Sequence, residues 1–440
     1  MIIAVLHPSV TRSRKSLVLV ISSMLVNPGF AGAQSDPGPR GGGAAAGGQI
    51  GGLTSAQVQA FLDGQARFNE VENVSNGLGP RFNSNQCASC HSFPAEGGTS
   101  PASNPQTQFA NSRNALPSFI QPNGPVREAR FIHNPDGSPD GGVHALFVVT
   151  GRSDGPSGCN INQEDFSNAG NLSLRIPTPV FGLGLIEAIP DAYLINNMTN
   201  TSGPRANLGI AGRFNRGGND GTITRFGWKA QNKSLDIFSG EAYNVEMGIT
   251  NLLFPNERGV DSMNDQTNCN PFAAPNDTDN LGSAGTAEFD DVSMFAAFMR
   301  FLAPPAPGPS SNSVVNGSNV FTNIGCALCH TVALQTGPNQ VAALSNQTIN
   351  AYSDFALHHM GSNLADQISQ GVAQGDEFRS APLWGLGQRL FLLHDGRTSD
   401  LVQAILAHAS SGSEANQVID NYNSLNHHDK QDLLNFLRSL

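Results

Sequence analysis

Residues 87–91 read CASCH and residues 326–330 read CALCH, so the pattern Cys-x-x-Cys-His occurs twice in this chain. The two thiols of each pattern lie about one helical turn apart, where both can add to the vinyl groups of one porphyrin, and the adjacent imidazole can ligate its iron. We therefore interpret each stretch as an attachment site for a covalently bound haem c. The alternative, a zinc or redox Cys-x-x-Cys site, does not explain a histidine directly after both pairs.

The N-terminus has the pattern of a secretory signal peptide. Three basic residues precede an apolar run over residues 17–26, and the small residues 31–33 provide a cleavage site. The run is short for a membrane span, although an uncleaved anchor is the alternative. We expect residues 1–33 to be the signal, residues 34–52, rich in glycine and alanine, to be a flexible linker, and the mature protein to be periplasmic or secreted.

Cysteine count and net charge restrict the environment and the partners of the chain. Six cysteines leave Cys159 and Cys269 outside the two motifs. In an oxidising compartment these two can form a disulfide, and the alternative is two unpaired thiols. The formal charge of −11 argues against binding to nucleic acid or to an anionic membrane face. An acidic surface suits a basic electron-donor protein, although most acidic surfaces are simply solubilising.

Two amphipathic helix patterns divide the chain into halves. Over residues 291–302 and again over residues 429–440, apolar residues recur at three- and four-residue spacing. Each half therefore opens near one Cys-x-x-Cys-His motif and closes with an amphipathic helix, as a cytochrome c module does. We expect a mainly α protein with two cytochrome c-like domains, over residues 53–302 and 312–440, joined by a proline-rich linker over residues 303–311.

The halves share a further repeat. Residues 179–184 read PVFGLG and residues 382–387 read PLWGLG. The shared motifs are much farther apart in the first half than in the second, because the first half has insertions at about residues 92–175 and 186–225. These insertions are rich in loop-forming residues, with residues 143–149 as a candidate strand. Long insertions often cover a site or carry function, although neutral surface growth is equally compatible.

The sequence resembles the bacterial di-haem cytochrome c peroxidase superfamily, and more closely its branch of di-haem oxidoreductases, also labelled thiol oxidoreductases. The resemblance spans nearly all of the mature chain and implies two haems that face each other across the domain boundary. Besides the stretches above, it is carried by GLGPRFN (77–83), GLGLIEAIP (182–190), RFGWKA (225–230), EMGIT (246–250), YSDF (352–355) and LHDGR (393–397).

The resemblance implies a set of iron ligands. His91 and His330 are the proximal ligands of the two haems. In the peroxidases a methionine after the His-Asp-Gly segment ligates the electron-transfer haem, and here His408 stands at that place. We expect His408 to be the sixth ligand of the second iron, which lowers its reduction potential relative to methionine. Met360 is the alternative there, and Met247 is a candidate ligand of the first iron.

At the first haem the resemblance implies a reaction centre. Glu246 corresponds to the distal acid or base, and Trp228 to the bridge between the haems. Cleavage of a peroxide requires a group that moves a proton from one oxygen to the other. Arg225 can polarise a bound peroxide or hold a haem propionate. The alternatives are a core tryptophan and a solvent-facing glutamate.

Two features depart from the peroxidase pattern. Phe238 stands where a glutamine often accompanies the distal glutamate, and the histidine loop that blocks the first haem in typical peroxidases is missing. His133 and His144, both in the first insertion, are candidates for a switchable sixth ligand, and the alternative is a surface or core role. Relatives hold a calcium ion between the haems, largely through backbone oxygens that leave no trace in a sequence.

These features predict a peroxidase-like oxidoreductase. Electrons are expected to pass from the C-terminal haem to the N-terminal haem and to reduce hydrogen peroxide or another small oxidant. The expected donor is a cytochrome or a cupredoxin, and no stable membrane span is expected. The alternatives are an electron-transfer cytochrome without substrate turnover and a di-haem oxidase or oxygenase of an organic or sulfur substrate.

Overall fold

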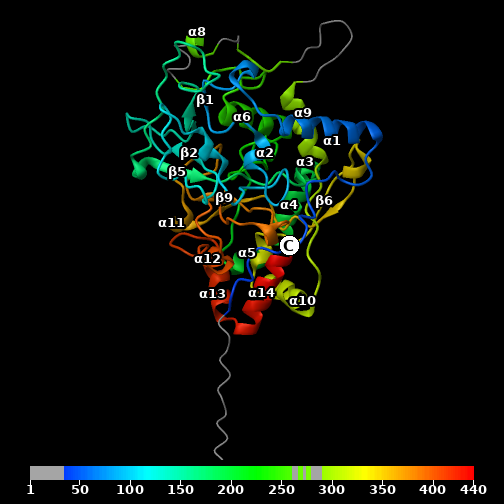
Figure 1. Ribbon diagram of the computed structural model, residues 1–440. Helices are drawn as coiled ribbons and strands as arrows, with labels where there is room; N and C mark the ends of the chain where they lie inside the picture. Colours follow the sequence, from blue (N-terminus) through cyan, green and yellow to red (C-terminus); the bar gives the residue numbers. More distant parts are fainter. Residues whose placement is uncertain (1–33, 260–265, 271–273, 279–289) are drawn as a thin grey trace, which may run out of the picture. The chain divides into compact units, whose positions relative to one another are not determined.

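The computed structural model describes residues 34–259, 266–270, 274–278 and 290–440 (Figure 1). The predicted signal peptide over residues 1–33 lies outside this part of the chain. Among the described residues, no helix is both long enough and apolar enough to span a membrane.

Helices carry most of the regular structure and the strands are short, which confirms the expectation of a mainly α protein. The α-helices are α1 (Ser55–Phe68), α2 (Cys87–Cys90), α3 (Leu183–Glu187), α4 (Asp191–Asn200), α5 (Ser202–Asn207), α6 (Leu235–Met247), α8 (Gln266–Cys269), α9 (Asp291–Phe301), α10 (Asn312–Asn323), α11 (Gly361–Leu364), α12 (Leu401–Leu406), α13 (Asn416–Ser424) and α14 (His427–Ser439). The strands are β1 (Arg81–Phe82), β2 (Glu128–Phe131), β3 (Val143–His144), β4 (Phe147–Val148), β5 (Leu172–Arg175), β6 (Leu334–Gln335), β7 (Thr348–Ile349), β8 (Leu357–His359) and β9 (Glu377–Arg379).

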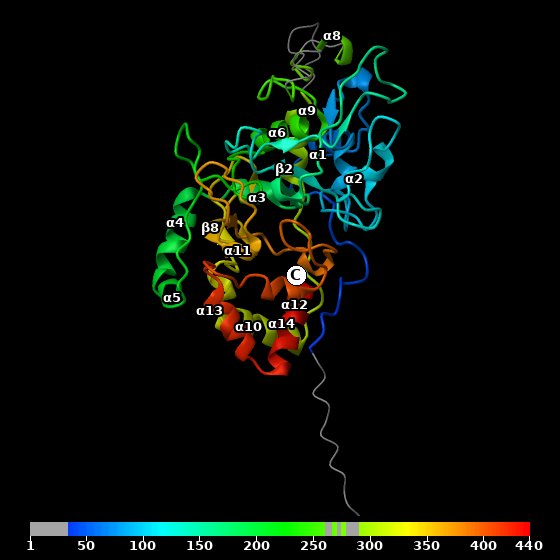
Figure 2. The ribbon, with the colours of Figure 1, turned by 90° about the vertical axis from the view of Figure 1, so that its left-hand side faces the viewer.

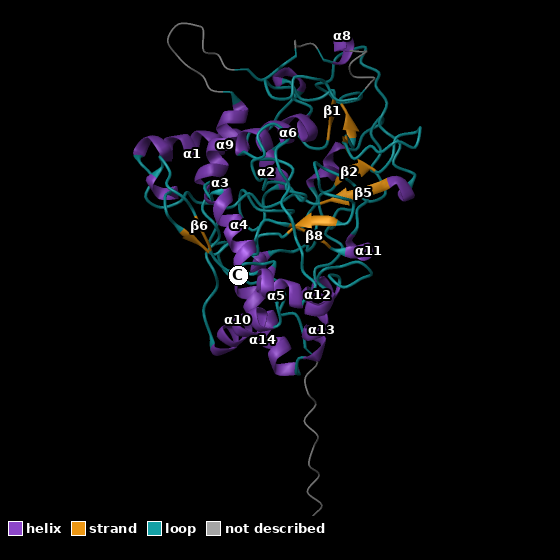
Figure 3. Ribbon diagram, turned by 180° about the vertical axis from the view of Figure 1, so that it is seen from behind, coloured by secondary structure: helices purple, strands orange, loops and turns teal. Residues whose placement is uncertain are grey.

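Each half is built on a crossed pair of helices, as the two amphipathic patterns predict. Helix α1 packs against α9, and α10 packs against α14 (Figure 3). A Cβ atom on Gly64 would lie 2.3 Å from the carbonyl oxygen of Met294, and one on Gly317 would lie 2.0 Å from the carbonyl oxygen of Asp432. Both crossings therefore bring the backbones so close that only glycine fits.

The PxxGLG repeat occupies the same place in both halves. A Cβ atom on Gly184 would lie 2.0 Å from the carbonyl oxygen of Arg300 in α9, and one on Gly387 would lie 2.1 Å from that of Arg438 in α14. The second glycine of each repeat thus lets the chain press against the closing helix of its own half. The sequence repeat is therefore also a structural repeat.

Side-chain caps define where the four paired helices begin. The side chains of Thr54, Asp290, Ser311 and Asn426 each accept a hydrogen bond from a backbone N–H in the first turn of α1, α9, α10 and α14, respectively. Each cap satisfies a donor that the helix itself leaves without a partner. The closing helices begin within two residues of the starts that the apolar spacing predicts.

The first insertion contains small antiparallel sheets. Strand β2 lies between β3 and β5, with Ala129 opposite both His144 and Leu174, and β1 pairs with β4. The candidate strand over residues 143–149 is therefore two short strands with different partners. Cys159 and Cys269 form a disulfide, which is one of the two outcomes that the sequence leaves open.

The segment over residues 34–52 is not a flexible linker, and that prediction is wrong. Asp36 forms a buried ion pair with Arg438, with 2.6 Å between Oδ2 and Nη2. The backbone N–H of Ile50 donates to the carbonyl of Phe301 at 2.7 Å. Glycine and alanine suggest flexibility, but here ordered contacts with distant residues hold the segment in place.

Two large apolar clusters fill the interior of the described chain. The smaller is built from α10, α12, α13 and α14, at one end of the structure in Figure 2. The larger belongs mainly to the first half but includes Leu334, Ile349 and Phe355 of the second. The two cores therefore do not separate at the proline-rich stretch over residues 303–311, and the boundaries of the two domains stay a prediction.

Candidate functional site

The first motif presents two thiols and an oriented imidazole to one cavity. Cys87 and Cys90 are free thiols at the two ends of α2. The Nδ1–H of His91 donates to the carbonyl of Gly98 at 3.0 Å, which leaves Nε2 available as a ligand. Burial lowers the pKa of His91 to about 4, so the imidazole is neutral, as a metal ligand must be.

The second motif repeats this arrangement. Cys326 and Cys329 are free thiols, and the Nδ1–H of His330 donates to the carbonyl of Tyr352 at 3.0 Å. Burial and the neighbouring His408 lower the pKa of His330 to about 4. Although the motifs lie far apart in the chain, the structure fixes the same tautomer in both.

We call the cavity beside His91 the first cavity and the cavity beside His330 the second cavity. The first is lined by residues of α2, β2, β5 and α6, and the second by residues of α10, α12, α13 and α14 and the segment between β9 and α12. Most of the wall area in both is apolar, as a porphyrin ring requires.

His408 shares the second cavity with His330, as predicted. Its Nδ1–H donates to the carbonyl of Ala404 at 2.8 Å, so its Nε2 is also left as a potential ligand. Burial lowers the pKa of His408 and keeps the ring neutral. Met360 lines the same cavity, but only His408 has the hydrogen bond that orients a ligand, so the structure favours the histidine.

His358 also lines the second cavity but has no free ring nitrogen. Its Nδ1 lies 2.8 Å from a carboxylate oxygen of Glu414, and its Nε2 lies 3.1 Å from one of Asp354. The neighbouring Cys329 and the carboxylate of Asp354 raise the pKa of His358 well above its ordinary value, against the effect of burial. The imidazole is therefore a buried cation between two anions and not a ligand.

Neither of the histidines in the first insertion lines the first cavity. Both ring nitrogens of His144 contact carboxylates, Nε2 with Asp140 at 3.0 Å and Nδ1 with Glu164 at 2.5 Å. His133 is exposed and forms an isolated β-bridge with Pro139 after β2. The structure therefore does not bring either one to the place of a switchable sixth ligand.

Trp228 lines both the first and the second cavity. Its indole N–H donates to the carbonyl of Ile176 at 2.9 Å, which fixes the ring. Trp228 therefore lies between the two cavities, and its role as a bridge between two centres stays a prediction. A tryptophan of a single core would not line both cavities.

Glu246, near the end of α6, lines the first cavity together with His91. Burial and the negative charge of Glu128, which is hydrogen-bonded to it, raise the pKa of Glu246, so this carboxyl keeps its proton near neutral pH. The neighbouring Arg130 and Arg175 instead lower the pKa of Glu128. Two adjacent carboxyls whose pKa values are pushed apart form an acid and a base at one site.

Sequence reasoning missed Glu128, Arg130 and Arg175, which also line the first cavity. Glu128 and Arg130 are two residues apart on β2, so they lie on one face of the strand, where their side chains pair. The signal in the sequence was the alternation of charged and apolar residues in a segment that otherwise reads as loops. Only the fold shows that this strand faces the motif.

Arg225 lies outside both cavities. Its guanidinium donates to the carbonyl groups of Ile186 at 3.2 Å and of Ile189, and it pairs with Asp191. These contacts tie the end of α3 to the start of α4. The structure therefore assigns Arg225 to the scaffold and not to the place predicted for it beside a peroxide or a propionate.

The decisive comparison is with a protein family. Residues 133–440 match the family described as "Di-haem oxidoreductase, putative peroxidase". The chain belongs to this family. The matched region includes the second motif, Glu246, Trp228 and His408, and it begins after the first motif. No curated protein is significantly similar to the chain.

Several solved structures show weak similarity. A MauG-like protein associated with microbial copper homeostasis is 16% identical over 34% of this chain and 52% of its own, with a TM-score of 0.23. Hydrazine synthase from Kuenenia stuttgartiensis is 14% identical over 35% of this chain and 57% of its own, with a TM-score of 0.23. The alignments thus span little more than half of those two proteins. The diheme peroxidase BthA from Burkholderia thailandensis is 13% identical over 93% of this chain and 94% of its own, with a TM-score of 0.37. At these TM-scores, family membership rests on the sequence match alone.

The residues of both cavities fit the haem groups that the family name implies. Each cavity offers two free thiols and one neutral imidazole. The second also has two buried guanidinium groups, Arg379 and Arg389, which bond only to carbonyl groups among the described contacts. Burial lowers the pKa of both to about 10, so they stay charged. Buried cations without a carboxylate partner suit the propionates of a haem.

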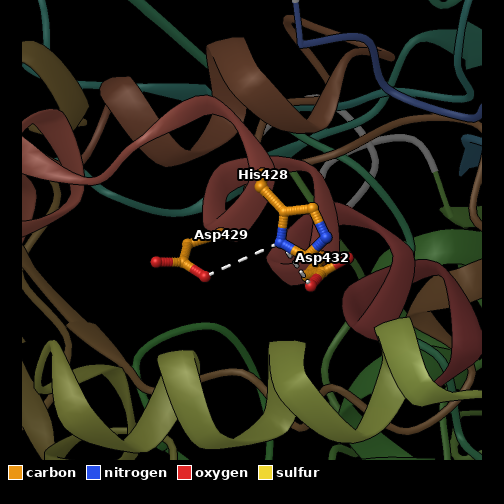
Figure 4. A group of neighbouring side chains, drawn as sticks. All are labelled: His428, Asp429 and Asp432. Carbon is orange, nitrogen blue, oxygen red and sulfur yellow. Dashed lines mark ion pairs between the residues drawn. The ribbon is translucent and has the colours of Figure 1, made fainter.

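A cluster on α14 resembles a metal site but is better explained as a helix start. His428 Nδ1 lies 3.2 Å from an oxygen of Asp432 and 3.9 Å from one of Asp429 (Figure 4). Both oxygens of Asp432 accept hydrogen bonds, from Ser313 and from Asn316. The side chain of His428 is 81% exposed, and acidic groups in a first turn favour the helix dipole.

Proposed function

We propose that this member of the di-haem family is an exported, peroxidase-type oxidoreductase that reduces hydrogen peroxide or another small oxidant. Haem, when bound, supplies the one-electron chemistry that no side chain of the chain can supply. Oxidoreduction by a di-haem protein is the family's description, and the oxidant, the electron path and the export are our proposals.

The attachment of the haems is the first part of the proposal. Cys87 and Cys90 would hold one porphyrin through thioether bonds, and Cys326 with Cys329 would hold the other. The Nε2 atoms of His91, His330 and His408 would ligate the irons. What supports this assignment is the hydrogen bond from Nδ1 to a backbone carbonyl, which all three imidazoles share.

The observation that carries the function is the protonated carboxyl of Glu246 in the first cavity. Peroxide reduction needs a proton on the oxygen that leaves as water, and Glu246 holds one at its carboxyl oxygen. Glu128, kept ionised beside it by Arg130, is a base that can accept the proton of the other peroxide oxygen and pass it to Glu246 through their hydrogen bond. An electron carrier without a substrate would have no use for this acid, so the pair favours an enzyme.

Electron entry at the second cavity and transfer through Trp228 complete the proposal. His330 and His408 would both ligate the iron of the second centre, which would suit exchange of electrons with a cytochrome or a cupredoxin. The first cavity holds the acid, so the oxidant would react there. We also propose a calcium ion between the two centres, as in the relatives. Backbone oxygens would supply most of its ligands.

Rapid mixing tests the proposed direction. The holoprotein, reduced at its second centre by a reduced cytochrome c, is mixed with hydrogen peroxide, and oxidation of that centre is followed by absorbance. We expect rapid oxidation in the unmodified protein and much slower oxidation in Trp228→Phe. The control Phe166→Leu removes an aromatic ring from the first insertion, outside both cavities. An oxidation rate that Trp228→Phe leaves unchanged contradicts the path, and no reaction with peroxide contradicts the function.

A further inference from the structure

A third cavity lies outside both motif cavities. Its volume is about 580 Å³, within the range of small-molecule sites. Its walls come from residues 50–52, 304–307 and 342–352, together with Leu185, Trp384 and Leu440. In Figure 3 the β6–β7 hairpin, which forms one wall, lies between α1 and α10.

The walls of the third cavity are uncharged. Ile50, Pro305 and Ile349 make apolar surfaces, and the rings of Tyr352 and Trp384 add an aromatic one. The amide side chain of Gln347 lies exposed at the rim, as do Thr348 and Asn350. Among the described residues, no Asp, Glu, Lys, Arg or His side chain lines this cavity, so its side chains offer an ionic ligand no partner. The chemistry fits a neutral aromatic ring with hydroxyl groups at its edge.

Trp384 connects this cavity to the interior. It also lines a small neighbouring cavity, together with Trp228, Arg379 and Arg389. A Cβ atom on Gly182 would lie 2.6 Å from the Trp384 ring, so the indole packs directly on bare backbone and is held in place. The chain has two tryptophans, and both line this small cavity. Trp228 continues the connection, because it lines the first and second cavities as well.

Tyr352 gives a second connection. Tyr352 lines the third cavity, and its carbonyl accepts the hydrogen bond from Nδ1 of His330 at 3.0 Å. A ligand in the third cavity would therefore touch the residue that orients an iron ligand. The third cavity thus lies directly behind the second centre.

We propose that the third cavity binds a hydroquinone and is a second entrance for electrons, with Trp384 between it and Trp228. Oxidation of one hydroquinone to the quinone breaks two O–H bonds and releases two electrons and two protons. The electrons pass inward by way of Trp384, and the protons leave at the exposed rim. Reduction of one hydrogen peroxide to two waters consumes the same number of each, so this step rests on the proposed function.

Binding is tested without electron transfer. Benzene-1,4-diol is titrated calorimetrically into the fully reduced holoprotein, in which it has no electron acceptor. We expect saturable binding, weakened about tenfold or more in Ala342→Trp, which places an indole in the mouth. The control Leu252→Trp adds the same group at an exposed site elsewhere. No binding, or equal binding in Ala342→Trp, overturns the proposal.

The route is tested on the oxidised holoprotein without peroxide. We expect the diol to reduce it, and Trp384→Phe to slow this reduction about tenfold at saturating diol, where a change in affinity no longer affects the rate. An unchanged rate overturns the role of Trp384. Turnover of peroxide by the unmodified protein with reduced cytochrome c tests the proposed function separately. If that turnover fails while the diol still binds and reduces the holoprotein, the proposed function is wrong, but the assignment of the third cavity as a hydroquinone site remains valid.

Discussion

The indole of Trp228 meets the imidazole of His394 edge to face, with ring centroids 6.3 Å apart. His394 in turn stacks on Phe378 at 4.3 Å. Trp228 comes from the first half of the chain and His394 from the His-Asp-Gly-Arg segment of the second. The tryptophan that lines both cavities is therefore fixed by the half that carries the second motif, and the relation of the two centres depends on this aromatic contact.

Buried charges reinforce the contact between the halves. Asp366 pairs with Arg175 at 2.7 Å and with Lys229 at 3.0 Å, and all three side chains are almost completely buried. Asp366→Asn would leave two buried cations without their anion, so we expect a loss of about 3–5 kcal/mol in the free energy of unfolding. Denaturant titration measures it. The exposed pair of Asp220 with Lys233 is the control, and Asp220→Asn should cost far less stability.

Glu246→Gln removes the proton donor of the first cavity and keeps its shape. Because positioned acid–base groups contribute typically 10²–10⁴-fold, we expect peroxide turnover to fall by about that factor while haem content stays the same. Steady-state assays and absorbance spectra measure both. Glu241→Gln, at another carboxylate of the same wall, provides the contrast. If Glu241→Gln abolishes turnover and Glu246→Gln does not, the acid is assigned to the wrong residue.

His408→Met tests the ligand of the second iron. Methionine in place of a second imidazole should raise the reduction potential, by a fraction of the roughly 0.8 V over which axial ligands tune haem. Spectroelectrochemical titration of the two centres measures the shift, which should be confined to one of them. A potential that responds to Met360→Leu and not to His408→Met would make Met360 the ligand.

The contribution of Glu72 to the stability of the fold should decline as the pH rises from about 4.5 to about 7. Burial and the charge of Glu70 raise the pKa of Glu72 from 4.5 to about 7. In this window the folded protein keeps a proton that the unfolded chain has lost, so stability is greatest below the unfolded pKa and falls as the pH rises. Glu72→Gln should flatten this decline by on the order of 1–3 kcal/mol, measured by denaturant titration across the range. Asp420→Asn, at an exposed carboxylate, should follow the unmodified protein, and an equally steep decline in Glu72→Gln would contradict the account.

Local patterns predicted the closing helix of each half and the grouping of side chains within each motif. The spacing of apolar residues located α9 and α14, because a helix repeats its face every three to four residues. Thiols and imidazoles that are close in the sequence are close in any fold. The proximity of Cys87, Cys90 and His91 to one another could therefore be predicted without a structure. Their counterparts in the second motif follow from the same reasoning.

Contacts between distant residues were beyond the sequence. Glu128 reaches Glu246 only because β2 of the insertion folds over α6, and no local pattern marks that approach. Asp36 pairs with Arg438 across nearly the whole chain, so a glycine-rich segment that reads as flexible is ordered. Arg225 is three residues before Trp228 in the sequence, but its guanidinium donates to a carbonyl group at the C-terminal end of α3. Carbonyl groups at that end have no partner within the helix, and no local pattern shows that Arg225 supplies one.

The central claim is that two haems are bound covalently, one at each motif. Intact mass spectrometry of the denatured, exported protein tests it most directly. We predict a mass higher than that of the polypeptide by two haems, and higher by one haem in Cys87→Ser/Cys90→Ser and in Cys326→Ser/Cys329→Ser. An unmodified mass, or a single haem that survives both double substitutions, would contradict the account.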